Sequence, residues 1–296
     1  MDKIIITGAS GNFGFSVVES LIHKGMPPNS IFAMTRNLSK TGKLVSLNVN
    51  IVHGDYDDHG TMLKAFSGMD KMLFISSDET QGRSEQHLRV VEAARESGIK
   101  HILYTSIEHK KVNFSLMDFV LSSHLETEKS IKDSGMDYTI LRNGLYMELL
   151  PYFLGENVLE NGIFLPAGEG KITFTLRREM AETAAIILAT KGHENKTYHI
   201  SGEGISFSQI AKEISNITGK NVTYLSPPLD TFLHVMTNHG VPRMYAKMIG
   251  GFSAAARQGE LEGGSQDMQK ILGRKPLAMK EYLEEIFFWK LLNNIG

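Results

Sequence analysis

The first fourteen residues, MDKIIITGASGNFG, constrain the fold more than any other stretch of this chain. The β-branched run over residues 3–7 predicts a short buried strand. Gly8, Gly11 and Gly14 then recur at intervals of three, and the apolar periodicity of residues 15–22 predicts a helix. Strand, glycine turn and helix in this order predict a doubly wound α/β fold that begins at the N-terminus.

This arrangement is suited to a dinucleotide. The free N–H groups and the positive dipole end of a helix N-terminus stabilise a pyrophosphate. We expect Gly8 to turn the chain, Gly11 to let the backbone approach the phosphates, and Gly14 to let the helix pack closely on the sheet. A plain strand-to-helix connector is the alternative, but the strand before the turn and the helix after it favour dinucleotide binding.

The second predicted strand, residues 31–34, ends at Thr35-Arg36-Asn37. The adenosine ribose lies at this point in a dinucleotide fold, where an acidic residue indicates NAD and an arginine suits the 2′-phosphate of NADP. Residues 30–40 contain no Asp or Glu. Arg36 therefore predicts NADP(H) as the cofactor, the alternative being a solvated surface arginine.

The third predicted strand, residues 49–54, leads into a polar turn. Asp55 and Tyr56 are placed to contact the adenine. Asp57 or Asp58 is expected to cap the helix that starts near Gly60.

Two further strands end in small hydroxyl side chains. One precedes Ser76 and Ser77, and the next ends at Thr105 and Ser106. Ligands bind at the carboxyl ends of strands in open parallel sheets, so we expect Ser76 and Ser77 to line the pyrophosphate and nicotinamide ribose.

The alternation of strands and helices continues six times to residue 144, which predicts a Rossmann-type doubly wound parallel sheet. Expected helices include residues 85–97, residues 122–134 with Ser122 or Ser123 as N-cap, and residues 148–160. We assign residues 1–144 plus 176–202 to the NAD(P)-binding domain. Residues 145–175 plus 203–296 form a smaller C-terminal substrate lobe.

Composition excludes several classes of protein. The 296 residues contain no cysteine, which excludes disulfides and fits a cytoplasmic location. A net charge of −2 with scattered basic residues argues against nucleic acid as a partner, and no apolar run is long enough to span a membrane. The eleven histidines show no metal-ligand spacing, so no metal is expected.

The motifs TGASGNFG, MTRN, ISS, the TS of the fifth strand, HLETEK and LRNGLYME occur in this order. In this combination the chain resembles the NmrA-like group of atypical short-chain dehydrogenase/reductases. Within that group it is similar to the bacterial NAD(P)H:quinone oxidoreductases and triphenylmethane-dye reductases. The similarity covers nearly the whole chain, more loosely after residue 220.

The resemblance implies NADPH binding and a quinone-like or dye-like small-molecule substrate. The residues that it implies for the cofactor are Gly8, Ala9, Ser10, Gly11, Asn12, Phe13, Arg36, Ser76, Ser77, Asn143, Gly144, Leu145, Tyr146, Glu148 and Arg177. Asp55, Thr105 and Ser106 are further candidates from their places at strand ends.

The chain departs from the broader superfamily in its catalytic residues. None of the nine tyrosines is followed four residues later by lysine, and Leu125 stands four residues before Lys129. The general acid of ordinary carbonyl reduction, worth about 10²–10⁴-fold in rate, is therefore missing. A quinone does not need it, because hydride addition gives a delocalised hydroquinone anion that water protonates.

Three residues are candidates for catalysis. Lys129 is expected to bind the nicotinamide ribose or steady the developing anion, and His124 to offer a proton; surface or structural positions are the alternatives. Tyr146 either stacks on the acceptor or packs within the lobe. The irregular segment 108–119 is placed to fold over the reactive end of the cofactor.

A second class of function is a regulator that senses the redox state of NADP and signals to a protein partner without turnover. The missing tyrosine suits this reading as well. An isomerase or epimerase would need that tyrosine. The sequence does not decide between a monomer and a homodimer.

Overall fold

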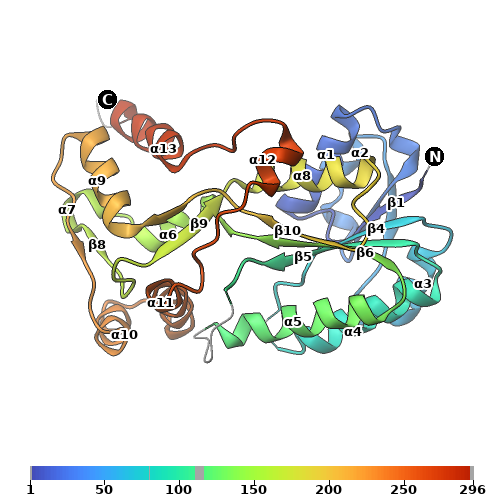
Figure 1. Ribbon diagram of the computed structural model, residues 1–296, viewed down its shortest axis with the longest axis horizontal. Coiled ribbons are helices and arrows are strands. Elements are labelled where there is room, and N and C mark those ends of the chain that lie inside the picture. Colours follow the sequence, from blue (N-terminus) through green and yellow to red (C-terminus); the bar gives the residue numbers. More distant parts are fainter. Residues whose placement is uncertain (1, 80, 111–116, 294–296) are drawn as a thin grey trace.

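The computed structural model describes residues 2–79, 81–110 and 117–293 (Figure 1). Its centre is a seven-stranded sheet of order β10-β6-β5-β4-β1-β2-β3, in which every pair of neighbours is parallel. The strands are β1 Ile4–Ile6, β2 Ile31–Thr35, β3 Asn50–His53, β4 Lys71–Phe74, β5 His101–Ile107, β6 Asp137–Asn143 and β10 Lys196–Ile200. The strand order reverses between β1 and β4, and a crevice for ligands opens there at the carboxyl ends.

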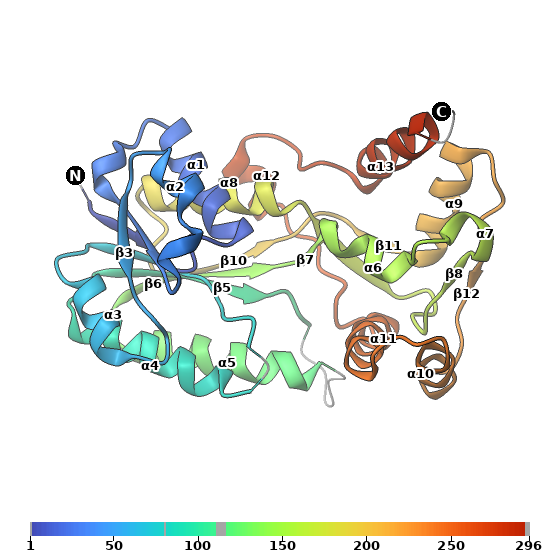
Figure 2. The same cartoon turned by 180° about the vertical axis from the view of Figure 1, so that it is seen from behind.

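Helices cover both faces of this sheet (Figures 1 and 2). Side chains alternate along a strand, so Ile4 and Ile6 pack on one face and Ile5 on the other; all three are fully buried. The first face carries α1 Asn12–His23, α8 Arg177–Ala189 and α12 Asp267–Leu272, and the second carries α3 His59–Phe66, α4 Arg83–Glu96 and α5 Asp118–Asp133. The predicted Rossmann-type fold is confirmed.

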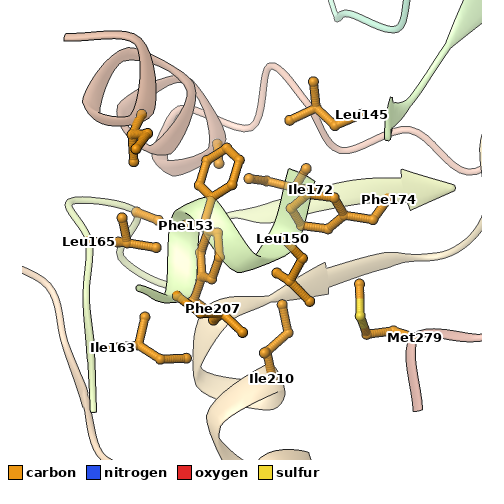
Figure 3. Packing of buried hydrophobic residues seen from close by; sticks show 14 of the residues in the cluster. Leu145, Leu150, Phe153, Ile163, Leu165, Ile172, Phe174, Phe207, Ile210 and Met279 are labelled. Atoms are coloured by element: carbon orange, nitrogen blue, oxygen red, sulfur yellow. The ribbon is translucent and has the colours of Figure 1, made fainter. Parts of the chain in front are cut away.

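The predicted lobe has a hydrophobic core made by its own elements together with Ile107 of β5 and Leu121 of α5 (part of it is drawn in Figure 3). The rings of Phe153, Phe174 and Phe207 meet there with centroids 5.8–6.4 Å apart. Its strands are β7 Leu145–Tyr146, β8 Ile163–Phe164, β9 Lys171–Thr175, β11 Gly204–Ser206 and β12 Tyr224–Leu225. Its helices are η3 Met147–Leu149, α6 Leu150–Leu154, α7 Val158–Asn161, α9 Phe207–Thr218, α10 Leu229–Asn238, α11 Arg243–Arg257 and α13 Met279–Asn293.

Two predicted helices are wrong in detail. α5 begins at Asp118 rather than at residue 122, and the hydroxyls of Ser122 and Ser123 donate to carbonyls of the preceding turn instead of capping it. The predicted helix over 148–160 is interrupted at Gly155, whose φ of +75° ends α6.

The predicted closing segment 108–119 includes residues 111–116, which lie outside the described residues. Short chain segments, η1 Pro28–Ser30, η2 Leu38–Lys40 and α2 Gly42–Val45, complete the first half of the fold. None of the helices in the described part of the chain is long and apolar enough to cross a bilayer.

Candidate functional site

The glycine turn joins β1 to α1 at the crevice. Gly8 has a φ of +58°, and the N–H of Gly11 donates to its carbonyl at 3.0 Å. A Cβ on Gly14 would lie 2.5 Å from Gly8 O and 2.8 Å from the Cα of Ala9. Gly14 is thus required by the turn itself, and not only by packing of the helix on the sheet.

The N-terminus of α1 is open to a ligand. Gly11 is the N-cap and supplies no side-chain hydrogen bond. The N–H groups of the first helical residues, Asn12, Phe13 and Gly14, have no acceptor within the helix. These groups and the positive end of the helix dipole form an anion-binding position, as the fingerprint predicts.

A cleft of about 470 Å³ extends from this turn along the carboxyl ends of the strands. It brings together thirteen of the predicted residues: Gly8, Ser10, Gly11, Asn12, Phe13, Gly14, Arg36, Asp55, Tyr56, Ser76, Ser77, Tyr146 and Arg177. Its lining also includes residues that the sequence analysis did not single out for the site, namely Met34, Lys40, Gly54, Asp78, Glu79 and Gln86.

One end of the cleft carries two cations, Arg36 and Lys40. The Arg36 side chain is 62% exposed, and its nearest acidic partner is Glu79 at 3.7 Å. An exposed pair at this distance is weak. The Arg36 guanidinium is therefore free to bind a phosphate, and Glu79 is its internal competitor.

The loop after β3 contains the helix cap that the sequence predicts. Asp58 Oδ1 accepts from the N–H of Thr61 at 3.1 Å and caps α3. The hydroxyl of Tyr56 is engaged inside the protein with Thr7 Oγ1 (2.5 Å) and Ile75 O (2.7 Å). Burial raises the pKa of Tyr56, so this residue offers the cleft a neutral ring rather than a proton.

The wall formed by residues 75–79 presents acceptors to the cleft. Three consecutive N–H groups already donate to buried side chains: Ile75 to Thr7 Oγ1, Ser76 to Thr105 Oγ1 and Ser77 to His87 Nε2, each at 2.9 Å. Ser77 Oγ donates to Gln86 at 2.9 Å. The carboxylates of Asp78 and Glu79, which line the cleft, suit ribose hydroxyls better than pyrophosphate. We therefore expect a ribose rather than the pyrophosphate beside Ser76 and Ser77.

The other end of the cleft is aromatic and cationic. The rings of Phe13 and Tyr146 stack at 6.3 Å, and the Arg177 guanidinium lies 4.5 Å above Tyr146. Glu148 accepts from the N–H of Arg177 at 3.1 and 3.2 Å and so caps α8. Burial raises the pKa of Tyr146. Glu148 thus acts through the backbone of Arg177 and does not line the cleft.

Lys129 does not reach the cleft. Its side chain is 79% exposed and pairs with Asp133 on the outer face of α5. The buried polar residues of α5 are instead Ser123, His124, Thr127 and Glu128. The expected role of Lys129 is incompatible with this placement, because the helix turns the position after Glu128 toward solvent.

His124 is inside the protein rather than in the cleft. It is 4% exposed, with Nδ1 2.8 Å from the Tyr104 hydroxyl and Nε2 2.9 Å from the Arg83 guanidinium. Burial, with the nearby charge of Arg83, holds the pKa of His124 well below its usual value. A neutral, fully engaged imidazole is unsuited to donate a proton to substrate.

Several other predicted residues lie just behind the cleft. Ser106 Oγ donates to Glu128 at 2.7 Å, and Glu128 forms a bidentate pair with Arg142 at 3.0 and 2.8 Å. Asn143 is 5% exposed, and its Oδ1 has no hydrogen-bond partner among the described residues. The remaining members of this group that do not line the cleft are Ala9, Thr105, Gly144 and Leu145.

The chain matches known proteins over nearly its full length. The NmrA-like family matches residues 1–283. Quinone oxidoreductase 2 of Escherichia coli is 35% identical over 96% of this chain and 98% of its own length. The structure of an Escherichia coli NADPH-dependent quinone oxidoreductase complexed with NADPH has a TM-score of 0.88 at 34% identity, covering 96% of this chain and 99% of that one.

A second structure is equally similar. Triphenylmethane reductase from Citrobacter sp., complexed with NADP(H), has a TM-score of 0.88 at 33% identity and covers 95% of this chain and 99% of that one. Both structures contain the cofactor that Arg36 predicts. The family match over most of the chain, together with these relatives, leads to one conclusion: the chain belongs to the NmrA-like family.

Proposed function

We propose that this protein is an NADPH-dependent oxidoreductase that transfers a hydride to a quinone or a similar flat, conjugated acceptor. The observation that carries the proposal is the cleft, which has an open helix N-terminus beside two cations and an aromatic end formed by Phe13 and Tyr146. The relatives described above, which include a quinone oxidoreductase and a dye reductase, support the same chemistry.

The residues present fit NADP(H). The turn from Gly8 to Phe13 would bind the pyrophosphate, and Arg36 with Lys40 the 2′-phosphate. Asp78 and Glu79 would accept from ribose hydroxyls.

When bound, NADPH supplies the hydride. The protein's residues orient and shield the reactants: Tyr146, held by Arg177, offers a flat surface for a conjugated acceptor. A hydroquinone anion spreads its charge over the ring and takes its proton from water, which is consistent with the absence of the Tyr–Lys pair. Residues 145–175 and 203–293, apart from α12, which packs on the central sheet, would close the acceptor side.

The test follows the absorbance of NADPH after benzoquinone or a triphenylmethane dye is added to purified protein. We expect oxidation that depends on the protein and is faster with NADPH than with NADH. A protein that binds NADPH tightly but leaves its absorbance unchanged with every acceptor would instead be a redox sensor.

A further inference from the structure

A buried polar network lies behind the cleft wall of residues 75–79. Its side chains come from α4, β5 and α5: His87, Tyr104 and Thr127 are fully buried, and His124 is 4% exposed. None of the four lines the cleft. The function proposed above does not use them.

The donors and acceptors of the network determine where its protons lie. The Arg83 guanidinium can only donate, so His124 Nε2, 2.9 Å away, must accept. Neutral His124 then carries its proton on Nδ1 and donates it to the Tyr104 oxygen at 2.8 Å. The Tyr104 hydroxyl also lies 3.4 Å from His87 Nδ1.

The second branch of the network begins at the cleft wall. The backbone N–H of Ser77 can only donate, so His87 Nε2 must accept it at 2.9 Å. Neutral His87 therefore holds its proton on Nδ1 and donates to Thr127 Oγ1 at 2.9 Å. The hydroxyl of Thr127 donates a hydrogen bond to the carbonyl oxygen of Ser123 at 2.6 Å. The two branches meet at His87 Nδ1, which lies close to both Thr127 Oγ1 and the Tyr104 hydroxyl.

The aromatic rings and the charge around His87 keep its imidazole neutral. The imidazole lies edge-on to the ring of Phe74 at 5.0 Å and to that of Tyr104 at 5.9 Å. Burial, together with the charge of Arg83, lowers the pKa of His87 to about 3. Protonation would remove the only lone pair that accepts from Ser77.

Gln86, which precedes His87 in α4, also contacts Ser77. Gln86 accepts from Ser77 Oγ at 2.9 Å and donates to Asp57 Oδ2 at 2.8 Å, so it ties this wall to the loop after β3. Two adjacent residues at the start of α4 thus hold the backbone and the side chain of Ser77. Gln86 lines the cleft, whereas His87 acts from behind it.

We propose that His87 is a positioning residue for the cofactor: its unprotonated Nε2 holds the Ser77 amide and thereby shapes the wall of residues 76–79 that faces the bound dinucleotide. The identity of the dinucleotide rests on the function proposed above. Without this acceptor, the Ser77 N–H would be left unsatisfied behind the wall, and the wall would rearrange to find a partner.

The test compares two variants of His87 with a matched control. His87→Leu removes the acceptor, and His87→Gln returns a carbonyl oxygen that can accept from Ser77. The control is His101→Leu: His101 is 7% exposed and contacts Thr139 Oγ1 at 2.9 Å, but it lies at the first residue of β5, at the opposite edge of the sheet from the cleft. Each protein is measured for its Kd for NADPH, KM for benzoquinone and Tm.

We expect His87→Leu to weaken NADPH binding about tenfold, the equivalent of one hydrogen bond, with KM for benzoquinone unchanged. His87→Gln should recover most of this loss, while His101→Leu lowers Tm without changing Kd. Equal Kd for His87→Leu and the wild type, or equal losses for the Leu and Gln variants, would overturn the proposal. A wild type that binds no NADPH would instead refute the proposed function.

A measurement on the wild type covers the case in which His87→Leu does not fold. Nitrogen-15 NMR of the histidine side chains distinguishes the two neutral tautomers. We expect His87 to carry its proton on Nδ1, with an unprotonated Nε2. A proton on Nε2 would contradict the assigned hydrogen bond from Ser77 and with it the proposal.

Discussion

Replacing Gly14 by alanine tests the glycine turn directly. The new Cβ would lie 2.5 Å from Gly8 O, whereas ordinary contact begins at 3.4 Å, so the carbonyl or the helix must move by about 0.9 Å. Gly8 O also accepts from the N–H of Gly11 at 3.0 Å, so that hydrogen bond is strained by the same movement. The atoms that the new Cβ would meet belong to the backbone, so a change of side-chain rotamer cannot relieve the clash.

We expect Gly14→Ala to cost about 1–3 kcal/mol of folding free energy, and about 2–4 °C of Tm for each kcal/mol. A displaced turn also misaligns the N–H groups that would meet the pyrophosphate. Loss of one charge-assisted hydrogen bond, about 1.5–3 kcal/mol, would weaken NADPH binding by about 10–100-fold. Calorimetric titration and thermal unfolding measure the two effects.

Gly42→Ala is the matched control. Gly42 also lies in the first turn of a helix, α2, but a Cβ there would meet nothing within 4 Å. Its Tm should be unchanged or slightly raised, and its Kd for NADPH unchanged. If Gly14→Ala behaved like Gly42→Ala in both measurements, the contact argument for this turn would be refuted.

Three further predictions concern charge. Arg36→Ala should weaken NADPH binding about tenfold or more and leave NADH unaffected. Glu79→Gln should tighten NADPH binding, because it removes the charge that competes for Arg36 and keeps an oxygen that can accept from a ribose hydroxyl; titrations with both cofactors check this. Lys129→Ala should change neither Kd nor kcat, since its ammonium is paired at the surface, and a tenfold fall in kcat would restore the catalytic hypothesis. Below pH 6.5 the unfolded chain binds protons at His87 and His124 that the native protein does not. The free energy of unfolding should therefore fall as pH is lowered, by up to about 2.7 kcal/mol per unit from the two residues together. Urea unfolding at pH 7 and pH 5 measures this slope, and a double Gln variant with the same slope as the wild type would contradict it.

The local sequence alone determined the sheet and the cofactor end of the cleft. The glycine turn, the position of Arg36 after β2 and the cap at Asp58 depend on neighbours within a few residues along the chain. Such features follow from backbone sterics and from strand-end geometry, which are the same in any protein of this class. The absence of a Tyr–Lys pair was also evident from the sequence, because the pair is defined by the spacing of its two residues along the chain.

Only the tertiary structure decided which side chains meet. One residue separates Glu128, buried against Arg142, from Lys129 in solvent, and a helix without a strong apolar stripe does not reveal that boundary. His87 is a polar residue on the buried face of α4, and this position was the one indication in the sequence that it has a structural role. Its acceptor role depends on Ser77 and Thr127, which lie ten and forty residues away, and no local rule connects them. Packing brings those groups together in the protein interior, where buried donors and acceptors pair with one another.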